Sequence, residues 1–501
     1  MDPKKTFYVT TPIYYVNDVP HIGHFYTNVA ADALARYHRL CGQDVMFLTG
    51  TDENSQKNVK AAEKLGRTDI QNYIDEMSAK WRETWKSLDI TNDDFIRTTE
   101  ERHKKAVEKF WNAVYAKGDI YQSDYEGYYC TGCEAFVLEF ELVNGKCPIH
   151  KIEPEFIKEK NWFFKLSAYR EKLLEHIDAH SDFIQPQSRR NEVRSYVEKF
   201  MSDVSISRES VKWGIPVPND PKNVIYVWFD ALINYISGVG YGTDEATFNK
   251  WWPVDVHLVG KDIIKFHCAL WPAMLMSADL ELPKTVFAHG FFTVNGDKMS
   301  KSLGNVVDPK EICSKYGIDP VRYFLLREIT FGGDGNFSLD RLAERYAGDL
   351  GNEFGNLVLR VTSMLQKYSD GVVSEKTTNE INEAWSSYHK AFKELRFDIA
   401  LDVIWKLIRE TNQSIDTNKP WALAKEGKTN ELDSLLYTWL ETLRHVAWMI
   451  RPIMPDASDK ILLQLKQDLN QSFEQCSFWG SLEPGLEINV SDPLFPRIEN
   501  A

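Results

Sequence analysis

A short segment near the start of the chain, Pro20-His21-Ile22-Gly23-His24, has residues suited to binding phosphate. It lies between a strand-like run and a run with helical spacing, and a helix N-terminus offers unpaired N–H groups and a positive dipole end. His21 and His24 lie on one face of the first turn, and Gly23 lets a flat ring approach the backbone. The segment predicts a nucleotide-phosphate site, whereas each residue taken singly also fits a structural role.

A second segment, Lys298-Met299-Ser300-Lys301-Ser302, carries two lysines in a loop of small polar residues. Such lysines can close over a triphosphate as mobile point charges, whereas the spacing alone also fits a solvated basic turn. The order along the chain favours the first reading, because one motif follows the first predicted strand and the other follows the last. In a doubly wound sheet both would meet at the same carboxyl edge.

The first half of the chain alternates strand-like and helical runs. Apolar strand-like runs occupy residues 7–15, 44–54, 224–231, 255–262 and 285–292. Strands that alternate with crossover helices predict an α/β fold with a doubly wound, mostly parallel, Rossmann-like sheet, whose ligands lie at the carboxyl ends of the strands.

The 501 residues exceed what one hydrophobic core usually serves, so we expect several domains. Aromatics, charges and clustered cysteines interrupt the alternation after about residue 115, and apolar stripes at helical spacing dominate the C-terminal part, which predicts a helical bundle. The expected divisions are a first half of the sheet domain, an insertion, a second half of the sheet domain, a connector with the two-lysine loop, and an all-α domain: 1–115, 116–205, 206–290, 291–345 and 346–501.

Composition places the chain among globular proteins, with 43% hydrophobic and 26% charged residues. No apolar run is long enough to cross a bilayer, and the N-terminus lacks the features of a signal or transit peptide, so we expect a cytoplasmic protein without membrane contact. The net charge of −14 provides no general basic field. Local basic patches can still bind RNA.

Four potential metal ligands lie close together in the predicted insertion. Cys130 and Cys133 form one pair, and Cys147 and His150 form the other. Two such pairs predict one structural, tetrahedral Zn²⁺ ion with no open coordination position, which argues against a catalytic role for the metal.

The HIGH and KMSKS sequences together resemble those of class I aminoacyl-tRNA synthetases, and the resemblance extends over essentially the whole chain. It implies that His21, Gly23 and His24 contact ATP phosphates and that Lys298 and Lys301 hold the pyrophosphate. His21, His24, Lys298 and Lys301 are then the catalytic residues, and Mg²⁺ accompanies ATP. The substrate carboxylate attacks the α-phosphorus without a covalent enzyme intermediate.

Further segments resemble the methionine-specific members with a single zinc knuckle. The resemblance implies that Asp52 receives the substrate ammonium group and that Gly260 and Asp262 contact adenosine. It assigns the methionine side chain to a pocket of apolar and aromatic residues, which suit a polarizable thioether: Ile13, Tyr15, Trp228, Ala231, Leu232, Tyr235, Ile263 and His267. Leu232 stands where some members have proline. The insertion is also too short for an editing domain.

The C-terminal domain resembles a tRNA anticodon-binding domain. Asn352, Asn356 and Arg360 recur on one predicted helix face, and Trp421 follows later. In the family, the matching amide and guanidinium groups contact anticodon bases and the indole stacks on one. Without the resemblance, a solvated polar stripe and a packed tryptophan would be the preferred explanation of these residues. The implied partners are methionine, ATP and tRNA(Met), and we expect a monomer because no strand-rich domain follows the bundle.

Three other functions remain to be weighed: another class I synthetase, a simple nucleotidyltransferase with a HIGH-type fold, and a non-catalytic RNA-binding relative. The segments around Trp228 and His267 argue against the first. The zinc insertion and helical bundle exceed what the second requires, and the intact histidines and lysines of the two motifs argue against the third.

Overall fold

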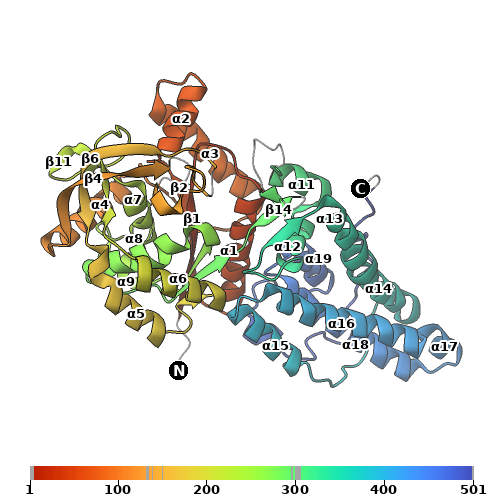
Figure 1. Ribbon diagram of the computed structural model, residues 1–501. Coiled ribbons are helices and arrows are strands. Elements are labelled where there is room, and N and C mark those ends of the chain that lie inside the picture. The colour runs from red at the N-terminus through yellow and green to blue at the C-terminus, as the bar shows by residue number, and fades with distance from the viewer. Residues whose placement is uncertain are drawn as a thin grey trace. The chain divides into compact units, whose positions relative to one another are not determined.

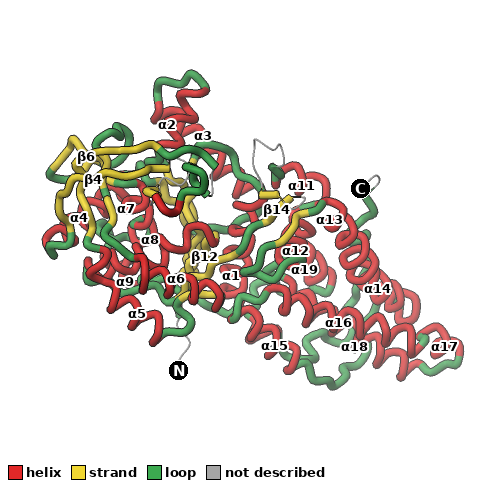
Figure 2. Tube along the Cα trace, in the orientation of Figure 1, coloured by secondary structure: helices red, strands yellow, loops and turns green. Residues whose placement is uncertain are grey.

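The computed structural model describes residues 5–130, 135–137, 139–148, 151–294, 297–298 and 306–498. The chain divides into two compact units. The sheet unit comprises Thr6–Pro20 and Met46–His289, and the helical unit comprises Met1–Lys5, His21–Val45 and Gly290–Ala501. Figure 1 shows the elements of both, and Figure 2 shows that most strands belong to the sheet unit.

The central sheet has the strand order β3-β2-β1-β12-β13-β7. The pairs β3–β2, β1–β12, β12–β13 and β13–β7 are parallel, as in the register Val256↔Thr285 between β12 and β13. From β1 the order runs outward to β2 and β3 on one side and to β12 and β13 on the other, which is a doubly wound topology with a switch point beside β1. The predicted α/β fold is therefore confirmed. The strand bounds are Asp94–Arg97 (β3), Asp44–Asp52 (β2), Thr6–Tyr15 (β1), Val256–Gly260 (β12), Thr285–His289 (β13) and Ile184–Gln185 (β7).

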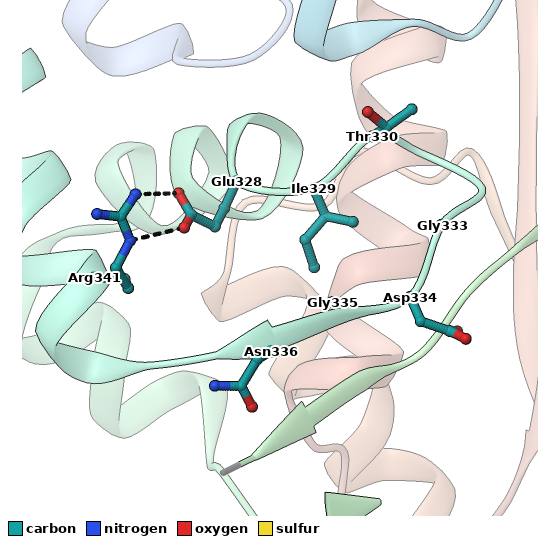
Figure 3. Close-up of a pocket in the computed structure, with 8 residues that line it drawn as sticks. All are labelled: Glu328, Ile329, Thr330, Gly333, Asp334, Gly335, Asn336 and Arg341. Carbon is teal, nitrogen blue, oxygen red and sulfur yellow. Dashed lines mark hydrogen bonds and ion pairs between the residues drawn. The ribbon is translucent and has the colours of Figure 1, made fainter. Parts of the chain in front are cut away.

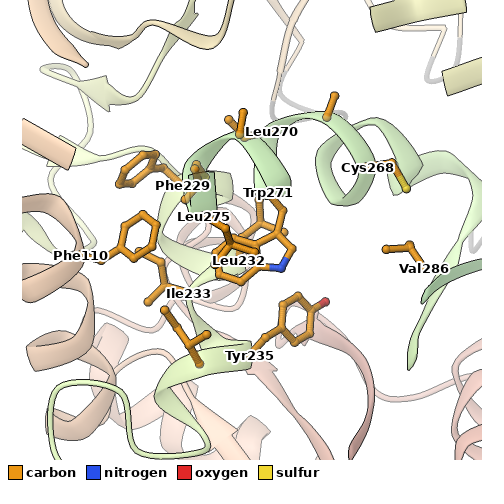
Figure 4. Packing of buried hydrophobic residues seen from close by; sticks show 14 of the residues in the cluster. Phe110, Phe229, Leu232, Ile233, Tyr235, Cys268, Leu270, Trp271, Leu275 and Val286 are labelled. Atoms are coloured by element: carbon orange, nitrogen blue, oxygen red, sulfur yellow. The ribbon is translucent and has the colours of Figure 1, made fainter. Parts of the chain in front are cut away.

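An apolar core fills the sheet unit around Trp271 (Figure 4). Phe110, Phe229, Leu232 and Tyr235 belong to this buried cluster. The helices that supply it are amphipathic, so one face of each is removed from water. The helices of this unit are Gln56–Lys64 (α2), Ile70–Ser87 (α3), Glu101–Ala116 (α4), Arg170–Ala179 (α5), Gln187–Phe200 (α6), Val227–Leu232 (α7), Asn234–Ser237 (α8), Glu245–Trp251 (α9) and Trp271–Ser277 (α10), with short turns at Leu166–Tyr169 (η2), Lys261–Ile263 (η3) and Phe266–Leu270 (η4).

The expected insertion contains an antiparallel sheet in the order β5-β4-β6-β8. Its long strands β4 and β6 pair along their whole length and lie side by side in Figure 2. A smaller antiparallel sheet has the order β10-β11-β9. The bounds are Ala135–Val137 (β5), Ile120–Cys130 (β4), Glu155–Phe164 (β6), Val204–Ser205 (β8), Pro216–Val217 (β10), Asp220–Ile225 (β11) and Ser207–Arg208 (β9), with a turn at Glu139–Glu141 (η1).

One predicted strand of the parallel sheet is wrong. The run 224–231 ends strand β11 of the smaller antiparallel sheet at Ile225 and continues as helix α7 from Val227. A short apolar run fits a buried strand and a buried helix equally well, so periodicity alone could not separate them.

The helical unit contains α1 and the C-terminal bundle. The predicted stripes around Trp385 and Leu440 are buried on α15 and α18, which confirms the bundle. Helix α18 packs against α16, beside which it runs in Figure 1. The bounds are Ile22–Leu40 (α1), Phe292–Val294 (β14), Asp297–Lys298 (β15), Pro309–Tyr316 (α11), Ile318–Arg327 (α12), Gly335–Phe337 (β16), Leu339–Arg345 (α13), Tyr346–Gly355 (η6), Asn356–Ser369 (α14), Asn382–Lys393 (α15), Phe397–Asn418 (α16), Pro420–Lys425 (α17), Thr429–Ile450 (α18), Pro455–Gln464 (α19) and Phe473–Cys476 (α20).

None of the described helices has the length and hydropathy needed to cross a lipid bilayer.

Candidate functional site

The histidine motif forms the first turn of α1. His21 caps the helix, and its Nδ1 accepts a hydrogen bond from the backbone N–H of Gly23 at 3.1 Å. Nδ1 of His24 accepts from the backbone N–H of His21 at 3.2 Å, and the two rings stack with centroids 3.7 Å apart. Desolvation, followed by the neighbouring His21, lowers the pKa of His24 well below its usual value. His24 is therefore neutral with its proton on Nε2, which makes that nitrogen a donor suited to a phosphate oxygen.

The lysine motif lies at the end of a hairpin in the same unit. Strands β14 and β15 pair antiparallel, with Thr293 opposite Lys298. Residues 299–305, including Lys301, lie outside the described residues, and so does the Lys298 side chain. Just beyond this segment the carbonyl of Val307 accepts a hydrogen bond from the backbone N–H of Ile22 at 3.0 Å. The chain that follows the second motif is thus bonded to the first turn of α1.

The carboxyl edge of the central sheet presents three of the predicted binding positions. Strand β2 ends at Asp52, β1 at Tyr15 and β12 at Gly260. These strands are neighbours in the sheet, so their ends lie along one edge beside the switch point, where doubly wound folds bind ligands. Asp52 is buried, and its Oδ1 accepts from the backbone N–H of Asn54 at 3.3 Å. Asp262 follows Gly260 in turn η3 and is exposed.

Tyr235, His267 and Ile263 form a hydrogen-bonded line inside the sheet unit. Nδ1 of His267 lies 3.0 Å from the carbonyl of Ile263, which can only accept, so this nitrogen carries the proton. Nε2 then accepts from the hydroxyl of Tyr235 at 2.7 Å. Burial lowers the pKa of His267 to about 4. The ring is therefore neutral, in one tautomer, with both nitrogens occupied.

Aromatic and apolar side chains surround that line. The indole of Trp228 stacks on Phe266 with centroids 4.0 Å apart and an interplanar angle of 4°, and meets the His267 ring edge-on at 6.2 Å. Its Nε1 is buried and has no hydrogen-bond partner among the described residues. Ile13 and Ile263 pack against the same core, Ala231 and Leu232 are buried, and Tyr15 packs with Trp228 in an adjoining cluster. The residues predicted to hold the thioether thus share one region of the sheet unit.

Two groups near this region could not be predicted from the sequence. The Arg208 guanidinium lies 4.0 Å from the ring centre of Tyr129, which clusters with Tyr15 and Trp228. Behind Tyr235, His257 accepts from Trp271 through Nε2 at 3.3 Å, so its Nδ1 donates to Thr10 at 2.7 Å. Neither group carries a local motif, because each depends on contacts between distant segments.

Two of the four predicted metal ligands can be placed. Cys130 and Cys147 are buried in one small cluster with Val137. A tight turn with positive φ at Asn144 and Gly145 precedes Cys147, and the N–H of Lys151 closes a further turn onto the Cys147 carbonyl at 2.9 Å. Cys133 and His150 lie outside the described residues. Cys130 ends strand β4, Cys147 follows a turn, and the two residues pack in this one buried cluster.

The residues predicted to read RNA lie in the helical unit. Asn352 on η6 and Asn356 on α14 are exposed, and Trp421 is 52% exposed. About half of the indole surface is therefore accessible to solvent. Arg360 donates to Asp416 at 2.6 Å and to Asn412 at 3.1 Å, both on α16, which orients its guanidinium.

A pocket of about 480 Å³ opens in the helical unit between the end of α12, β16 and α13 (Figure 3). On its wall Arg341 donates two hydrogen bonds to the carboxylate of Glu328, from Nε at 2.9 Å and from Nη2 at 3.3 Å. None of the predicted site residues that the structure describes lines it, so the pocket plays no part in the assignment.

Comparison with known proteins covers almost the whole chain. A family model described as class I (M) tRNA synthetases matches residues 7–153 and 137–362, and a model of the anticodon binding domain of methionyl tRNA ligase matches residues 367–501. The methionine–tRNA ligase of Thermotoga maritima is 47% identical over 98% of this chain and 80% of its own length, and that of Rickettsia bellii is 46% identical over 99% of both. The solved structure of Mycobacterium tuberculosis methionyl-tRNA synthetase in complex with methionyl-adenylate superposes with a TM-score of 0.94 at 41% identity, covering 98% of this chain and all of that one.

These matches extend through the sheet, the two sequence motifs and the C-terminal bundle. The chain therefore belongs to the methionine–tRNA ligase family of class I tRNA synthetases.

Proposed function

We propose that this chain activates methionine with ATP to methionyl-adenylate and pyrophosphate, and then transfers methionine to the 3′-terminal adenosine of tRNA(Met). Family membership supports the reaction. The choice of methionine rests on one structural observation. His267 is neutral, both of its ring nitrogens are hydrogen-bonded, and it lies beside the stacked rings of Trp228 and Phe266. An uncharged, polarizable pocket with few hydrogen-bond donors suits a thioether, and burying a charged side chain there would cost free energy.

Activation requires charge stabilisation and alignment, not an enzyme nucleophile. We assign the phosphates to His21, Gly23 and His24 and the pyrophosphate to Lys298 and Lys301. The Nε2–H group of neutral His24 donates to a phosphate oxygen, where charge develops in the transition state. Mg²⁺ bound with ATP would share that charge. We assign adenosine to Gly260 and Asp262.

The donors that face the sulfur follow from the hydrogen bonds of the pocket. Both nitrogens of His267 are occupied by Tyr235 and Ile263, so His267 offers its ring and no N–H group. We assign the donor role to the Tyr15 hydroxyl or to the indole N–H of Trp228, with Ile13, Ala231, Leu232 and Ile263 as the apolar wall. Asp52 receives the ammonium group.

We further propose that Cys130, Cys133, Cys147 and His150 hold one structural Zn²⁺ ion. The burial of Cys130 and Cys147 in one cluster supports it, since thiolates are the ligands that zinc prefers. Zinc analysis of the purified chain tests it: we expect about one equivalent, reduced in Cys147→Ser. A metal content that is unchanged by the substitution would contradict the ligand set.

The remaining assignments follow the domain divisions of the sequence. We propose that 1–115 and 206–290 form the catalytic domain, 116–205 guides the acceptor end of the tRNA, and 291–345 connects to an anticodon-binding domain at 346–501. There, Asn352, Asn356 and Arg360 contact anticodon bases and Trp421 stacks on one. We propose that the enzyme acts as a monomer in the cytoplasm.

Exchange of pyrophosphate into ATP, with each amino acid offered singly, tests the reaction. We expect exchange with methionine. Exchange driven by a different amino acid would favour another class I synthetase, and exchange that appears only with an acceptor other than an amino acid would favour a simple nucleotidyltransferase. No exchange at all would favour a non-catalytic RNA-binding protein.

A further inference from the structure

A chain of buried hydrogen bonds links the end of β2 to α4, α7 and α8. Oδ2 of Asp230 accepts from Nδ2 of Asn54 at 2.7 Å, and Oδ1 lies 2.7 Å from Nε2 of His103. Nδ1 of His103 lies 2.8 Å from the hydroxyl oxygen of Ser237. All four side chains are buried, and Asp230 and His103 are completely so. The proposed reaction uses none of them.

Such a network needs a reason, because removing a carboxylate from water costs several kcal/mol unless it is fully paired. Here each oxygen of Asp230 has a donor from a different part of the sheet unit: Asn54 after β2, and His103 on α4. A satisfied buried network fixes the elements that it joins. The elements at its two ends therefore indicate its role.

One end of the network reaches Asp52. The backbone N–H of Asn54 donates to Oδ1 of Asp52 at 3.3 Å, and the Asn54 side chain donates to the carbonyl of Thr98 at 3.4 Å besides Asp230. The other end of the network is part of the helix that forms the proposed methionine pocket, because Asp230 lies on α7 between Trp228 and Ala231. The network thus ties the carboxylate assigned to the ammonium group to the wall assigned to the side chain.

We propose that Asn54 and Asp230 are positioning residues that set the register between Asp52 and the wall formed by α7 and α8, and so determine which amino-acid length is accepted. Neither touches the substrate. An amino acid binds well only when its ammonium group reaches Asp52 while its side chain fills the pocket, so a fixed register selects length. This inference rests on the proposed function, since it needs Asp52 to receive the ammonium group.

Asn54→Ala tests the inference, because it removes the link and leaves the His103–Asp230 pair intact. In methionine-dependent pyrophosphate exchange we expect the KM for methionine to rise about 10- to 100-fold while the KM for ATP stays unchanged. The analogue 4-(methylthio)butanoate, which lacks the ammonium group, should inhibit wild type and variant equally. Equal loss for methionine and the analogue would overturn the proposal, because it would mean that Asn54 only holds the pocket together.

A double-mutant cycle provides a second readout. Asp230→Ala removes both acceptor oxygens and with them the bond to Asn54, so Asn54→Ala should add little to its effect on the KM for methionine. Additive effects would overturn the link between the two residues. Thermal unfolding of each variant separates misfolding from misplacement, and the less disruptive Asn54→Ser replaces Asn54→Ala if the latter does not fold.

Asn58→Ala is the matched control. Asn58 is buried near the same loop and donates to the backbone carbonyl of Asp52 at 2.9 Å. This variant should lose stability but keep the wild-type ratio of methionine to analogue affinity, and a changed ratio would contradict a specific role for Asn54. An unchanged Asn54→Ala variant in an active enzyme overturns this inference alone, whereas a wild type without methionine-dependent exchange overturns the proposed function.

Discussion

His267 keeps an uncharged ring because burial lowers its pKa to about 4, below the usual value of about 6.5. The carbonyl of Ile263 and the hydroxyl of Tyr235 also fix its tautomer. A protonated ring would have a donor on Nε2 and would turn the Tyr235 hydroxyl around. The pocket therefore depends on a neutral histidine.

The stability of the protein should consequently fall in mild acid. Between pH 6.5 and about 4 the unfolded chain binds a proton at residue 267 that the folded chain excludes, so stability rises with pH. The contribution is fully present above pH 6.5 and is lost as pH falls toward 4, with a magnitude on the order of 3 kcal/mol. Urea unfolding of wild type and His267→Gln across this range measures it as the difference between the two curves. Parallel curves would contradict it, because the other buried histidines contribute equally to both.

A substitution at Trp421 should distinguish a role in tRNA recognition from a role in the stability of the fold. Its side chain is 52% exposed, so it contributes little to the core. We expect Trp421→Ala to lower tRNA charging about 10-fold or more, since stacking on one base is worth about 1–3 kcal/mol, while pyrophosphate exchange stays unchanged. Measuring both activities on one preparation checks this. Loss of exchange would show that the residue supports the fold.

At the scale of elements, the sequence predicts well what depends on local pattern. The parallel strands ending at Asp52 and Gly260 and the helical bundle could be predicted, because periodicity and turn chemistry are local. The run 224–231 could not, because tertiary contacts choose between strand and helix there. The bond between Asn54 and Asp230 could not be predicted either, since it joins segments with no shared motif.

Helix α1 is held within the helical unit by a buried ion pair. Nη2 of Arg322 on α12 lies 2.7 Å from Oδ2 of Asp32, and both side chains are fully buried. Arg322 also donates to the carbonyls of Ile453 and Pro452, after α18, at 2.8 and 3.1 Å. One guanidinium thus joins the helix that begins with the histidine motif to the bundle.

Removing Arg322 should be costly, because Asp32 stays buried and keeps only its second ion pair, with Arg36 at 2.7 Å. We expect Arg322→Met to lower the free energy of unfolding of the helical unit by about 3–5 kcal/mol. The double variant Asp32→Leu/Arg322→Met should recover part of that loss, since no fully buried carboxylate remains, and the Arg36 guanidinium that loses Asp32 is 18% exposed. Urea unfolding of the wild type, the single variant and the double variant measures both effects.

Arg341→Met is the control. Arg341 pairs with Glu328 in the same unit but is 46% exposed, so its loss should cost about 1 kcal/mol or less. Equal losses for Arg322→Met and Arg341→Met would mean that the buried pair does not determine how firmly α1 is attached.

At the scale of the whole molecule, the net charge of −14 opposes a polyanionic partner. Affinity for tRNA must therefore come from local contacts. Arg360 is one of the proposed contacts, but Asp416 at 2.6 Å already offsets its charge. A compensated guanidinium acts as a hydrogen-bonding fork and adds little to the attraction between protein and phosphates.

The salt dependence of tRNA charging tests this view of Arg360. Each phosphate contact contributes about 0.7 to 0.9 to the slope of log affinity against log salt, whereas a contact to a base edge contributes little. We expect Arg360→Gln to raise the KM for tRNA(Met) while the slope of log KM against log KCl stays as in wild type. A slope shallower by about one contact would assign Arg360 to the backbone. The KM for methionine, a zwitterion without net charge, should change little across the same salt range and serves as the internal reference.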